Sequence, residues 1–288
     1  MPDADVQVRR ATAEDAQDSG RICYEAFRAI NEAHGFPADF PHPEMAVGLL
    51  SMLFANPGFH CLVAELDGRI IGSICLDVRS PIAGLGPITI DPILQNRGAG
   101  RKLMRAAMDH AEGRGAAGIR LVQAAFHNRS LALYASLGFV VREPLACMQG
   151  RTELRGVPGC VVRPAHVADL PACNDLSLRV HGFGRGAELA QAIAHGSALV
   201  VERAERITGY ATALAFFGHA AAESNLDLQA LITSEEAFAG PGILVPSRNH
   251  ALFRWCLEQG LRVVQPMTLM TMGLYNEPSG AWLPSVTF

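Results

Sequence analysis

The chain has 288 residues, of which 49% are hydrophobic and 18% are charged. A chain of this length favours two domains over one, and the composition is that of a globular protein rather than a disordered or fibrous one. The net charge of -4 gives no reason to expect a nucleic-acid partner.

Two further features bear on compartment and metals. No apolar run approaches the roughly 20 residues that cross a bilayer, and the opening letters MPDADVQVRR lack the apolar core of a secretory signal. The 7 cysteines are scattered and lack metal-ligand spacing. We therefore expect free thiols, a cytoplasmic location, no membrane association and no metal.

The chain repeats itself. VRRATAED at 8–15 recurs as VRPAHVAD at 162–169, which places Arg163 at the position of Arg9. CLVAELDGRIIGSICL at 61–76 likewise recurs as ALVVERAERITGYATAL at 198–214. Matches in the same order along the chain indicate two structural copies.

A third pair follows in that order, IRLVQ at 119–123 and LRVVQ at 261–265. Between the copies, GRTELRGVPG at 150–159 is polar and contains glycine and proline, as linkers do. We expect one domain over 1–155 and a second over 156–288.

The first copy opens with a short strand at 6–9. Thr12, with Asp15 three residues later, forms a capping-box-like start to a helix that runs to about residue 30. A second helix is predicted around 45–54. Two strands then meet at Asp67-Gly68, a dipeptide that favours a tight hairpin turn.

The next strand ends in GPITI at 86–90, and an amphipathic helix follows the letters QNRGAG at 95–100. IRLVQAAF is a further strand, and Asn128 is the predicted N-cap of a helix that ends at Leu137-Gly138. FVVRE and LACMQ are predicted as two final strands. The order β, α, α, β, β, β, α, β, α, β, β predicts a mixed α/β sheet.

The turn QNRGAG carries a QxxGxG pattern between a strand and a helix. The first helical turn has N–H groups without intrahelical partners, and the aligned peptide dipoles favour negative charge there. Gly98 and Gly100 let the backbone approach a ligand closely. The pattern therefore predicts a pyrophosphate-binding turn, although such a turn can also simply begin a helix. It lacks the GxGxxG and GK[ST] signatures of other nucleotide folds.

In these residues the first copy resembles the GCN5-related N-acetyltransferase (GNAT) family. Gln95, Gly98 and Gly100 match its pyrophosphate motif, while Asn128 and LYASLGF at 133–139 match a later motif. The resemblance covers about residues 6–150. It implies a tandem protein of two GNAT-like domains that moves an acetyl group from acetyl-CoA to a primary amine by direct attack, without a metal.

The resemblance also implies roles for individual residues. Acetyl-CoA would bind a strand, a turn and a helix start, namely Ile88, Thr89, Ile90, Gln95, Asn96, Arg97, Gly98, Ala99, Gly100, Arg101 and Asn128. A backbone N–H near Ile90 would polarise the thioester carbonyl. Tyr134 would act as the general acid that protonates the leaving thiolate. The alternative for Tyr134 is a tyrosine packed beneath the sheet.

The attacking amine must also lose a proton, and here the sequence leaves alternatives open. The candidates are acidic groups and histidines on or near the predicted strands and in the variable segment 31–58, namely Asp91, Glu65, His60, His42 and Glu44. Each could equally be a solvated surface group.

The second copy is expected to be degenerate. Keeping the spacing of the third repeat pair, Gly98 and Gly100 fall on Gly240 and Gly242 in AFAGPG, and Tyr134 falls on Asn276. Since proline has no N–H, Pro241 would remove one phosphate contact. The second half also resembles degenerate C-terminal domains of tandem acetyltransferases. We expect it to be structural or to shape the substrate cleft, which leaves one CoA site.

Two other functions stay open. A non-catalytic acyl-CoA-binding or regulatory protein would keep the turn without turnover, and an oxidoreductase could bind a nucleotide there. The acceptor, a small-molecule or peptide amine, is not identified by the sequence, which is also compatible with a homodimer.

Overall fold

The computed structural model describes residues 6–287. The chain packs as two compact units. Unit 1 holds the described residues up to 121 together with 127–138 and Thr287, and unit 2 holds 122–126 and 139–286. Within the described residues, no helix is both long enough and apolar enough to span a bilayer.

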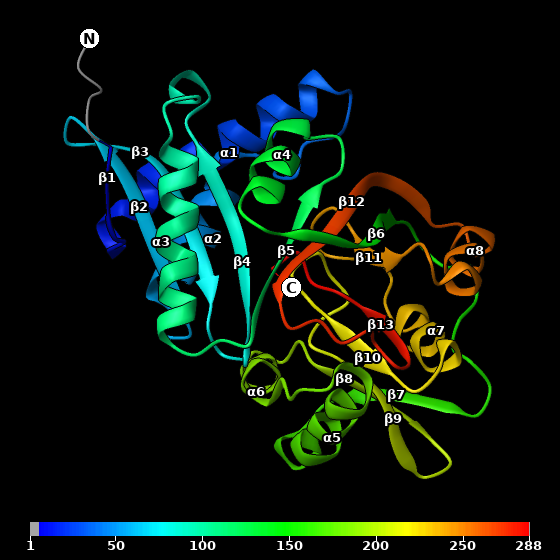
Figure 1. Ribbon diagram of the computed structural model, residues 1–288. Helices are drawn as coiled ribbons and strands as arrows, with labels where there is room; N and C mark the ends of the chain where they lie inside the picture. The colour runs from blue at the N-terminus through cyan, green and yellow to red at the C-terminus, as the bar shows by residue number, and fades with distance from the viewer. Residues whose placement is uncertain (1–5, 288) are drawn as a thin grey trace. The chain divides into compact units, whose positions relative to one another are not determined.

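Unit 1 is a strand layer with helices on both faces. Its elements are β1 (Gln7–Arg10), α1 (Ala16–Ala33), α2 (Pro43–Ala55), β2 (Phe59–Leu66), β3 (Arg69–Asp77), β4 (Ile82–Ile90), α3 (Ala99–Gly113), the start of β5 (Gly118–Ala124) and α4 (Asn128–Ser136). The strand order is β1-β2-β3-β4-β5, with β4 and β5 parallel and the other pairs antiparallel. Figure 1 shows α3 in front of these strands and α1 and α2 behind them. The mixed α/β sheet predicted from the sequence is confirmed.

Apolar residues at helical spacing attach α3 to the sheet. Its buried stripe comprises Ala99, Leu103, Met104, Ala107 and Ala111. On the opposite face, a cluster joins α1 and α2 to β2 and β3 through residues such as Cys23, Leu50, Val63 and Cys75. The alternation of strand side chains between two faces allows both helix layers to pack on one sheet.

One arginine joins the start of the chain to the hairpin. Arg9 on β1 donates to both carboxylate oxygens of Asp15, at 2.7 and 2.8 Å, and from Nη2 to Glu65 on β2 at 2.7 Å. Asp15 also accepts the Thr12 N–H at 2.7 Å, which confirms the predicted capping box. The interaction therefore fixes β1, the helix start and β2 together.

The second copy repeats this arrangement. Arg163 on β7 (Cys160–Pro164) donates to Asp169 at 2.7 and 2.9 Å and to Glu202 on β8 (Leu199–Arg203) at 2.6 Å. In both hairpins the register slips immediately before the paired glutamate, Glu65 or Glu202. The first two repeat pairs seen in the sequence therefore correspond to equivalent structure.

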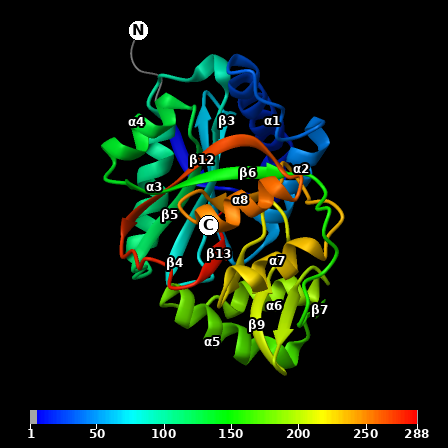
Figure 2. The same cartoon turned by 90° about the vertical axis from the view of Figure 1, so that its right-hand side faces the viewer.

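Unit 2 contains the remaining elements. Besides β7 and β8 these are β6 (Val140–Gln149), α5 (Leu170–His181), α6 (Gly186–Ala194), β9 (Arg206–Ala211), β10 (Ala220–Ala222), α7 (Asn225–Thr233), β11 (Ile243–Pro246), α8 (His250–Glu258), β12 (Arg262–Gly273) and β13 (Ala281–Leu283). Five strands form a sheet in the order β13-β10-β9-β8-β7. A second group has β6 between β12 and β11, and Figure 2 shows β6 beside β12.

The prediction of two final strands in the first copy is wrong, because 140–149 is the single strand β6. Pro144 does not interrupt it. The Pro144 carbonyl accepts the Ser247 N–H at 3.0 Å, while the ladder with β11 begins only at Leu145. The missing proline N–H therefore lies at the end of the ladder with β11, where it removes no hydrogen bond from within that ladder. This strand packs in unit 2, although it precedes the predicted linker; the domain boundary near 155 stays a prediction.

The third repeat pair is also wrong. LRVVQ at 261–265 follows α8 and opens β12, whereas IRLVQ at 119–123 precedes α4 in β5. Gly138 after α4 and Gly260 after α8 share a left-handed conformation, with φ of 99° and 91°. By this order β12 corresponds to β6, and Tyr134 corresponds to Cys256 rather than to Asn276. Both sequences read as buried strands, which is why they resemble each other.

We expect Asp15→Asn to lower the free energy of unfolding by about 2 kcal/mol at pH 7, because the Arg9 guanidinium lowers the pKa of Asp15 to about 2. A carboxylate with a lowered pKa stabilises the fold above its unfolded value, and this stability is lost as the pH falls toward 2. Urea unfolding at pH 7 and pH 3 should show the difference from wild type shrinking in acid.

Asp18→Asn is the control, since Asp18 is exposed and lies 3.6 Å from Arg21. It should change stability by less than about 0.5 kcal/mol at either pH. A loss at Asp15 no larger than this would contradict the role of the Arg9 interaction.

Candidate active site

The end of β4 has one paired edge and one open edge. On the β3 side, Ile88 and Ile90 pair with Ile74 and Gly72. On the β5 side, the ladder within the described residues covers only Ile82–Gly84, after which the parallel strands have no further pairing. The later part of β4 therefore presents backbone that an extended ligand could pair with. The Thr89 side chain is buried near Cys23, so only the backbone of this residue is available on that edge.

The turn after β4 begins the helix as the sequence predicts. Gly98 is the N-cap of α3 with φ of 81°, a left-handed conformation that favours glycine. A Cβ placed on Gly98 would have no atom within 4 Å, so space is open in front of the helix N-terminus. Asn96, Arg97 and Gly98 are exposed, whereas Ala99 is buried against the sheet. An anion could therefore reach the first amides of α3 from solvent.

Side chains tie this turn to β4 and α4. Gln95 Nε2 donates to the Ile90 carbonyl at 3.3 Å, and Arg129 donates to Gln95 Oε1 at 2.8 Å and to Asn96 Oδ1 at 2.7 Å. Arg101 reaches Ser136 Oγ at 2.9 Å. The structure thus brings the predicted turn residues together with the helix that carries Tyr134. Arg129 was missed by the sequence reasoning; its position in the first turn after Asn128 was the available signal.

The N-cap of α4 is His127, not Asn128 as predicted. His127 Nδ1 accepts the Ser130 N–H at 3.3 Å, and it therefore caps the helix in place of the asparagine side chain. Burial, reinforced by nearby Arg129, lowers the pKa of His127 and favours the neutral ring that can accept. Asn128 is the first helical residue and is exposed, so its side-chain amide does not cap the helix.

Tyr134 is buried in α4, with 7% of its surface exposed. Burial raises the pKa of its hydroxyl above the usual range, so the phenol keeps its proton at neutral pH. The adjacent Leu133 lies near the end of β4, because a Cβ on Gly100 would be 3.7 Å from both Leu133 Cδ2 and Ile90 Cγ1. The helix that carries Tyr134 is thus held beside the candidate turn.

The candidate proton acceptors have other partners. Glu65 is bound by Arg9, His42 pairs with Glu44 at 3.1 Å, and Asp91 accepts the Ile93 N–H at 2.9 Å. His60 stacks on His110 with ring centroids 3.4 Å apart. Burial, together with Arg10, His110 and Arg114, lowers the pKa of His60 to about 4. These contacts single out none of the five as the general base.

The geometry of unit 1 agrees with comparison to known proteins. Residues 24–139 match the model of the Acetyltransferase (GNAT) family. The mycothiol acetyltransferase of Thermomonospora curvata is 34% identical over 105 residues, covering 34% of this chain and 35% of that protein. The [ribosomal protein bS18]-alanine N-acetyltransferase of Salmonella typhimurium is 36% identical over 88 residues, covering 30% of this chain and 60% of that protein. The matched region therefore spans about a third of one relative and 60% of the other.

Two solved structures extend the likeness over the whole chain. A putative acetyltransferase from Pyrococcus horikoshii has a TM-score of 0.71 at 19% identity, covering 96% of this chain and 94% of that chain. A tandem GNAT protein from the clavulanic acid biosynthesis pathway has a TM-score of 0.55 at 15% identity, covering 98% and 100%. At such identities the likeness concerns the fold, which is a tandem GNAT fold.

The second GNAT-like copy differs at the place of the turn. Only Glu223 and Ser224 separate β10 from α7, whereas 91–98 separate β4 from α3. The earlier assignment of the turn to Gly240 and Gly242 is therefore wrong, because these glycines precede the strand β11 and not a helix.

The first turn of α7 contains a buried carboxylate of the chain itself. Asp227 is fully buried and accepts from Ser224 at 2.6 Å, from Thr208 at 2.6 Å and from Arg203 at 2.9 Å. Burial alone would raise its pKa, but these hydrogen bonds lower it, so Asp227 is charged. In addition, β13 pairs along β10, with Ala220 opposite Leu283.

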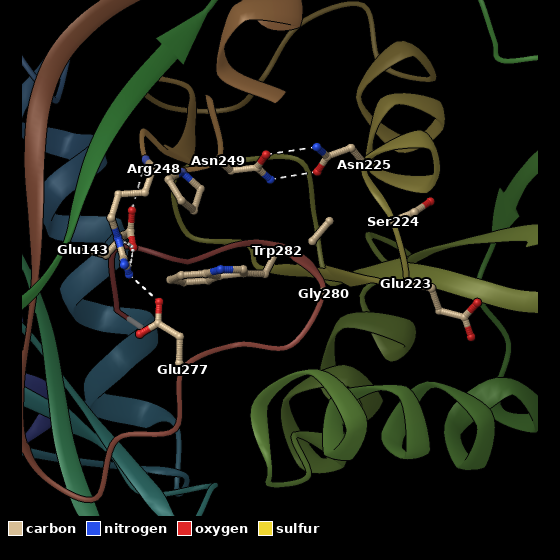
Figure 3. Close-up of a pocket in the computed structure, with 11 residues that line it drawn as sticks. Glu143, Glu223, Ser224, Asn225, Arg248, Asn249, Glu277, Gly280 and Trp282 are labelled. Carbon is tan, nitrogen blue, oxygen red and sulfur yellow. Dashed lines mark hydrogen bonds and ion pairs between the residues drawn. The ribbon is translucent and has the colours of Figure 1, made fainter. Parts of the chain in front are cut away.

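A pocket of about 450 Å³ lies in unit 2 near this helix start (Figure 3). Asn225 and Asn249 exchange hydrogen bonds of 3.0 and 2.8 Å across it. Arg248 reaches Glu143 at 2.7 Å and also pairs with Glu277. Glu223 adds a third carboxylate to the lining and pairs with Arg206 at 2.6 Å and with Arg179 at 3.4 Å.

We expect His127→Ala to lower the free energy of unfolding by about 1 kcal/mol at pH 8, because the Ser130 N–H would lose its acceptor. Asn128→Ala should cost less than about 0.5 kcal/mol. Urea denaturation of both variants measures the difference, and a larger loss at Asn128 would contradict the assignment of the cap.

His127→Asn separates the cap from its titration. Since the pKa of folded His127 is lowered, its contribution is complete above the unfolded value of 6.5 and is lost as the pH falls below it. The asparagine variant should keep the cap and lack this acid-dependent loss. An unchanged pH profile in this variant would count against His127 as the titrating group.

Proposed function

We propose that the protein transfers an acetyl group from acetyl-CoA to a primary amine in unit 1, by direct attack and without a metal. The observation that carries the proposal is the open, left-handed Gly98 turn at the start of α3, held beside the helix of Tyr134. The family match over 24–139 covers both parts.

Binding would use backbone groups more than side chains. The diphosphate of CoA would lie on the amides of residues 96–101, where the helix dipole favours negative charge. The pantetheine arm would pair with the open edge of β4 around Ile88 and Ile90, and exposed Asn128 would contact the same arm. Gly98 and Gly100 leave the room that such a close approach requires.

The reaction would then use a fixed backbone N–H donor near Ile90 and the protonated phenol of Tyr134. The amine nitrogen attacks the thioester carbon, a backbone N–H near Ile90 stabilises the charge on oxygen, and the C–S bond breaks. Tyr134 gives its proton to the leaving sulfur. Its raised pKa keeps that proton in place at neutral pH, and the proton lost by the amine restores the phenol through water.

We further propose that unit 2 binds no acyl-CoA and that the second copy is structural or shapes the substrate cleft. The charged Asp227 places a negative charge in the first turn of α7, and β13 covers the edge of β10.

The acceptor is proposed to be a small-molecule or peptide amine. The two relatives named above act, by their names, on mycothiol and on an alanine of a ribosomal protein, so they point to different substrates. A cytoplasmic location, the absence of nucleic-acid, membrane and metal partners, and a homodimer remain predictions from the sequence.

The amine panel is the direct test. CoA release from acetyl-CoA is measured with a peptide that begins with alanine, a lysine peptide, polyamines, aminoglycosides and free amino acids. We expect one class to support turnover, and Tyr134→Phe to lower kcat at least about 100-fold with unchanged CoA affinity, as loss of a general acid does. CoA binding without turnover of any amine, and without an effect of Tyr134→Phe, would favour a non-catalytic CoA-binding protein.

Two variants test the turn itself. Gly98→Pro cannot adopt the φ of 81° and should abolish CoA binding, whereas Gly98→Asn tolerates that conformation and should retain most of it. An active Gly98→Pro protein would contradict the turn assignment. A melting temperature raised by NAD and not by CoA would favour the oxidoreductase alternative.

The single site gives a stoichiometric prediction. Isothermal titration of the full chain with CoA should give one molecule per chain, because the proposed site lies in unit 1 alone. Gly98→Pro should then remove all heat of binding. Two molecules per chain, or residual binding in this variant, would show that unit 2 also binds CoA.

A further inference from the structure

Arg129 occupies an unusual place for a cation. It lies in the first turn of α4, is exposed, and donates to two neutral amide oxygens, Gln95 Oε1 and Asn96 Oδ1. A positive charge in the first helical turn opposes the helix dipole. No carboxylate within residues 6–287 forms an ion pair with it, so the guanidinium charge is not compensated.

Three other arginines of the protein are placed differently. Arg9, Arg163 and Arg203 each donate to a buried carboxylate, where the pair fixes neighbouring elements. Arg129 fixes elements too, but through neutral groups, and it leaves N–H donors of its five uncommitted. Its charge therefore lies beside the turn that leads into Gly98.

The contacts also explain how the turn keeps its shape. Asn96 has φ of 69°, a left-handed conformation that non-glycine residues seldom adopt. Arg129 holds its side chain, and it also holds Gln95, which bonds back to the Ile90 carbonyl. A single guanidinium thus connects the end of β4, the turn and α4.

We propose that Arg129 is a binding and positioning residue for the diphosphate of acyl-CoA, which rests on the proposed function of unit 1. Two of its donors hold Gln95 and Asn96, and the remaining donors contact a diphosphate oxygen. Arginine suits this double task because its planar fork bonds several acceptors at once. Arg129 acts on binding and not on the chemical step.

The experiment compares CoA with dephospho-CoA, which keeps the diphosphate and lacks the 3′-phosphate. We expect Arg129→Met to raise the Kd of both ligands by about the same factor, about 10-fold, with a weaker salt dependence than wild type. Arg129→Lys should be intermediate, because it keeps the charge and cannot bridge both amides. In turnover, KM for acetyl-CoA should rise while kcat at saturation stays unchanged.

Arg69→Met is the matched control, since Arg69 is an exposed cation beside the hairpin turn and its loss changes the net charge equally. It should leave both Kd values within about 2-fold of wild type. Each variant should still unfold cooperatively without ligand, which excludes a general loss of fold.

Three results would overturn the inference. In the first, Arg129→Met binds CoA as tightly as Arg69→Met. In the second, Arg129→Met loses affinity for CoA but not for dephospho-CoA, which would place Arg129 on the 3′-phosphate. A fall in kcat with unchanged KM would place it in the chemical step. Wild-type protein that binds neither ligand would refute the proposed function itself, a result distinct from these three.

Discussion

Each copy depends on an arginine that bridges two carboxylates. In the first copy, Arg9 links the opening strand to Asp15 at the helix start and to Glu65 on the hairpin. In the second, Arg163, Asp169 and Glu202 repeat these contacts with nearly the same distances. Because a bidentate guanidinium fixes direction as well as distance, it sets the angle at which the first helix leaves the sheet.

The sheet then positions the candidate site. The hairpin fixes β3, which pairs with the end of β4 at Gly72 and Ile90 and holds the strand that leads into the turn. Since β5 pairs with β4 only through Gly84, the later half of β4 keeps an open edge. The binding geometry thus follows from where a parallel ladder stops, combined with a left-handed glycine at the next helix start.

Short-range features could be predicted from the sequence. The Thr12–Asp15 capping box, the Asp67-Gly68 hairpin and the stripe on α3 each depend on residues within a few positions, so local chemistry determines them. The continuity of β6 could not, because its partners β11 and β12 lie about a hundred residues along the chain. The identity of the α4 cap could not be predicted either, because the side chains of His127 and Asn128 both carry a hydrogen-bond acceptor.

The predicted alignment of the second copy with the first was wrong for a related reason. IRLVQ and LRVVQ are alike because any buried strand is rich in branched apolar residues, so their likeness carries little information about position. The glycines after α4 and α8 were better markers, because Gly138 and Gly260 share a backbone conformation that few other residues adopt. Geometrically demanding positions align the two copies more securely than apolar ones.

Duplication has left the same helix start in two opposite electrostatic states. In unit 1 the N-terminus of α3 begins at an open glycine, with the uncompensated charge of Arg129 beside it. In unit 2 the first turn of α7 carries the buried carboxylate of Asp227, whose charge is balanced by Arg203. A carboxylate in the first turn of a helix repels an external anion, whereas a cation beside the helix start attracts one. The proposed difference in CoA binding between the two copies thus follows from the charge that each helix start carries.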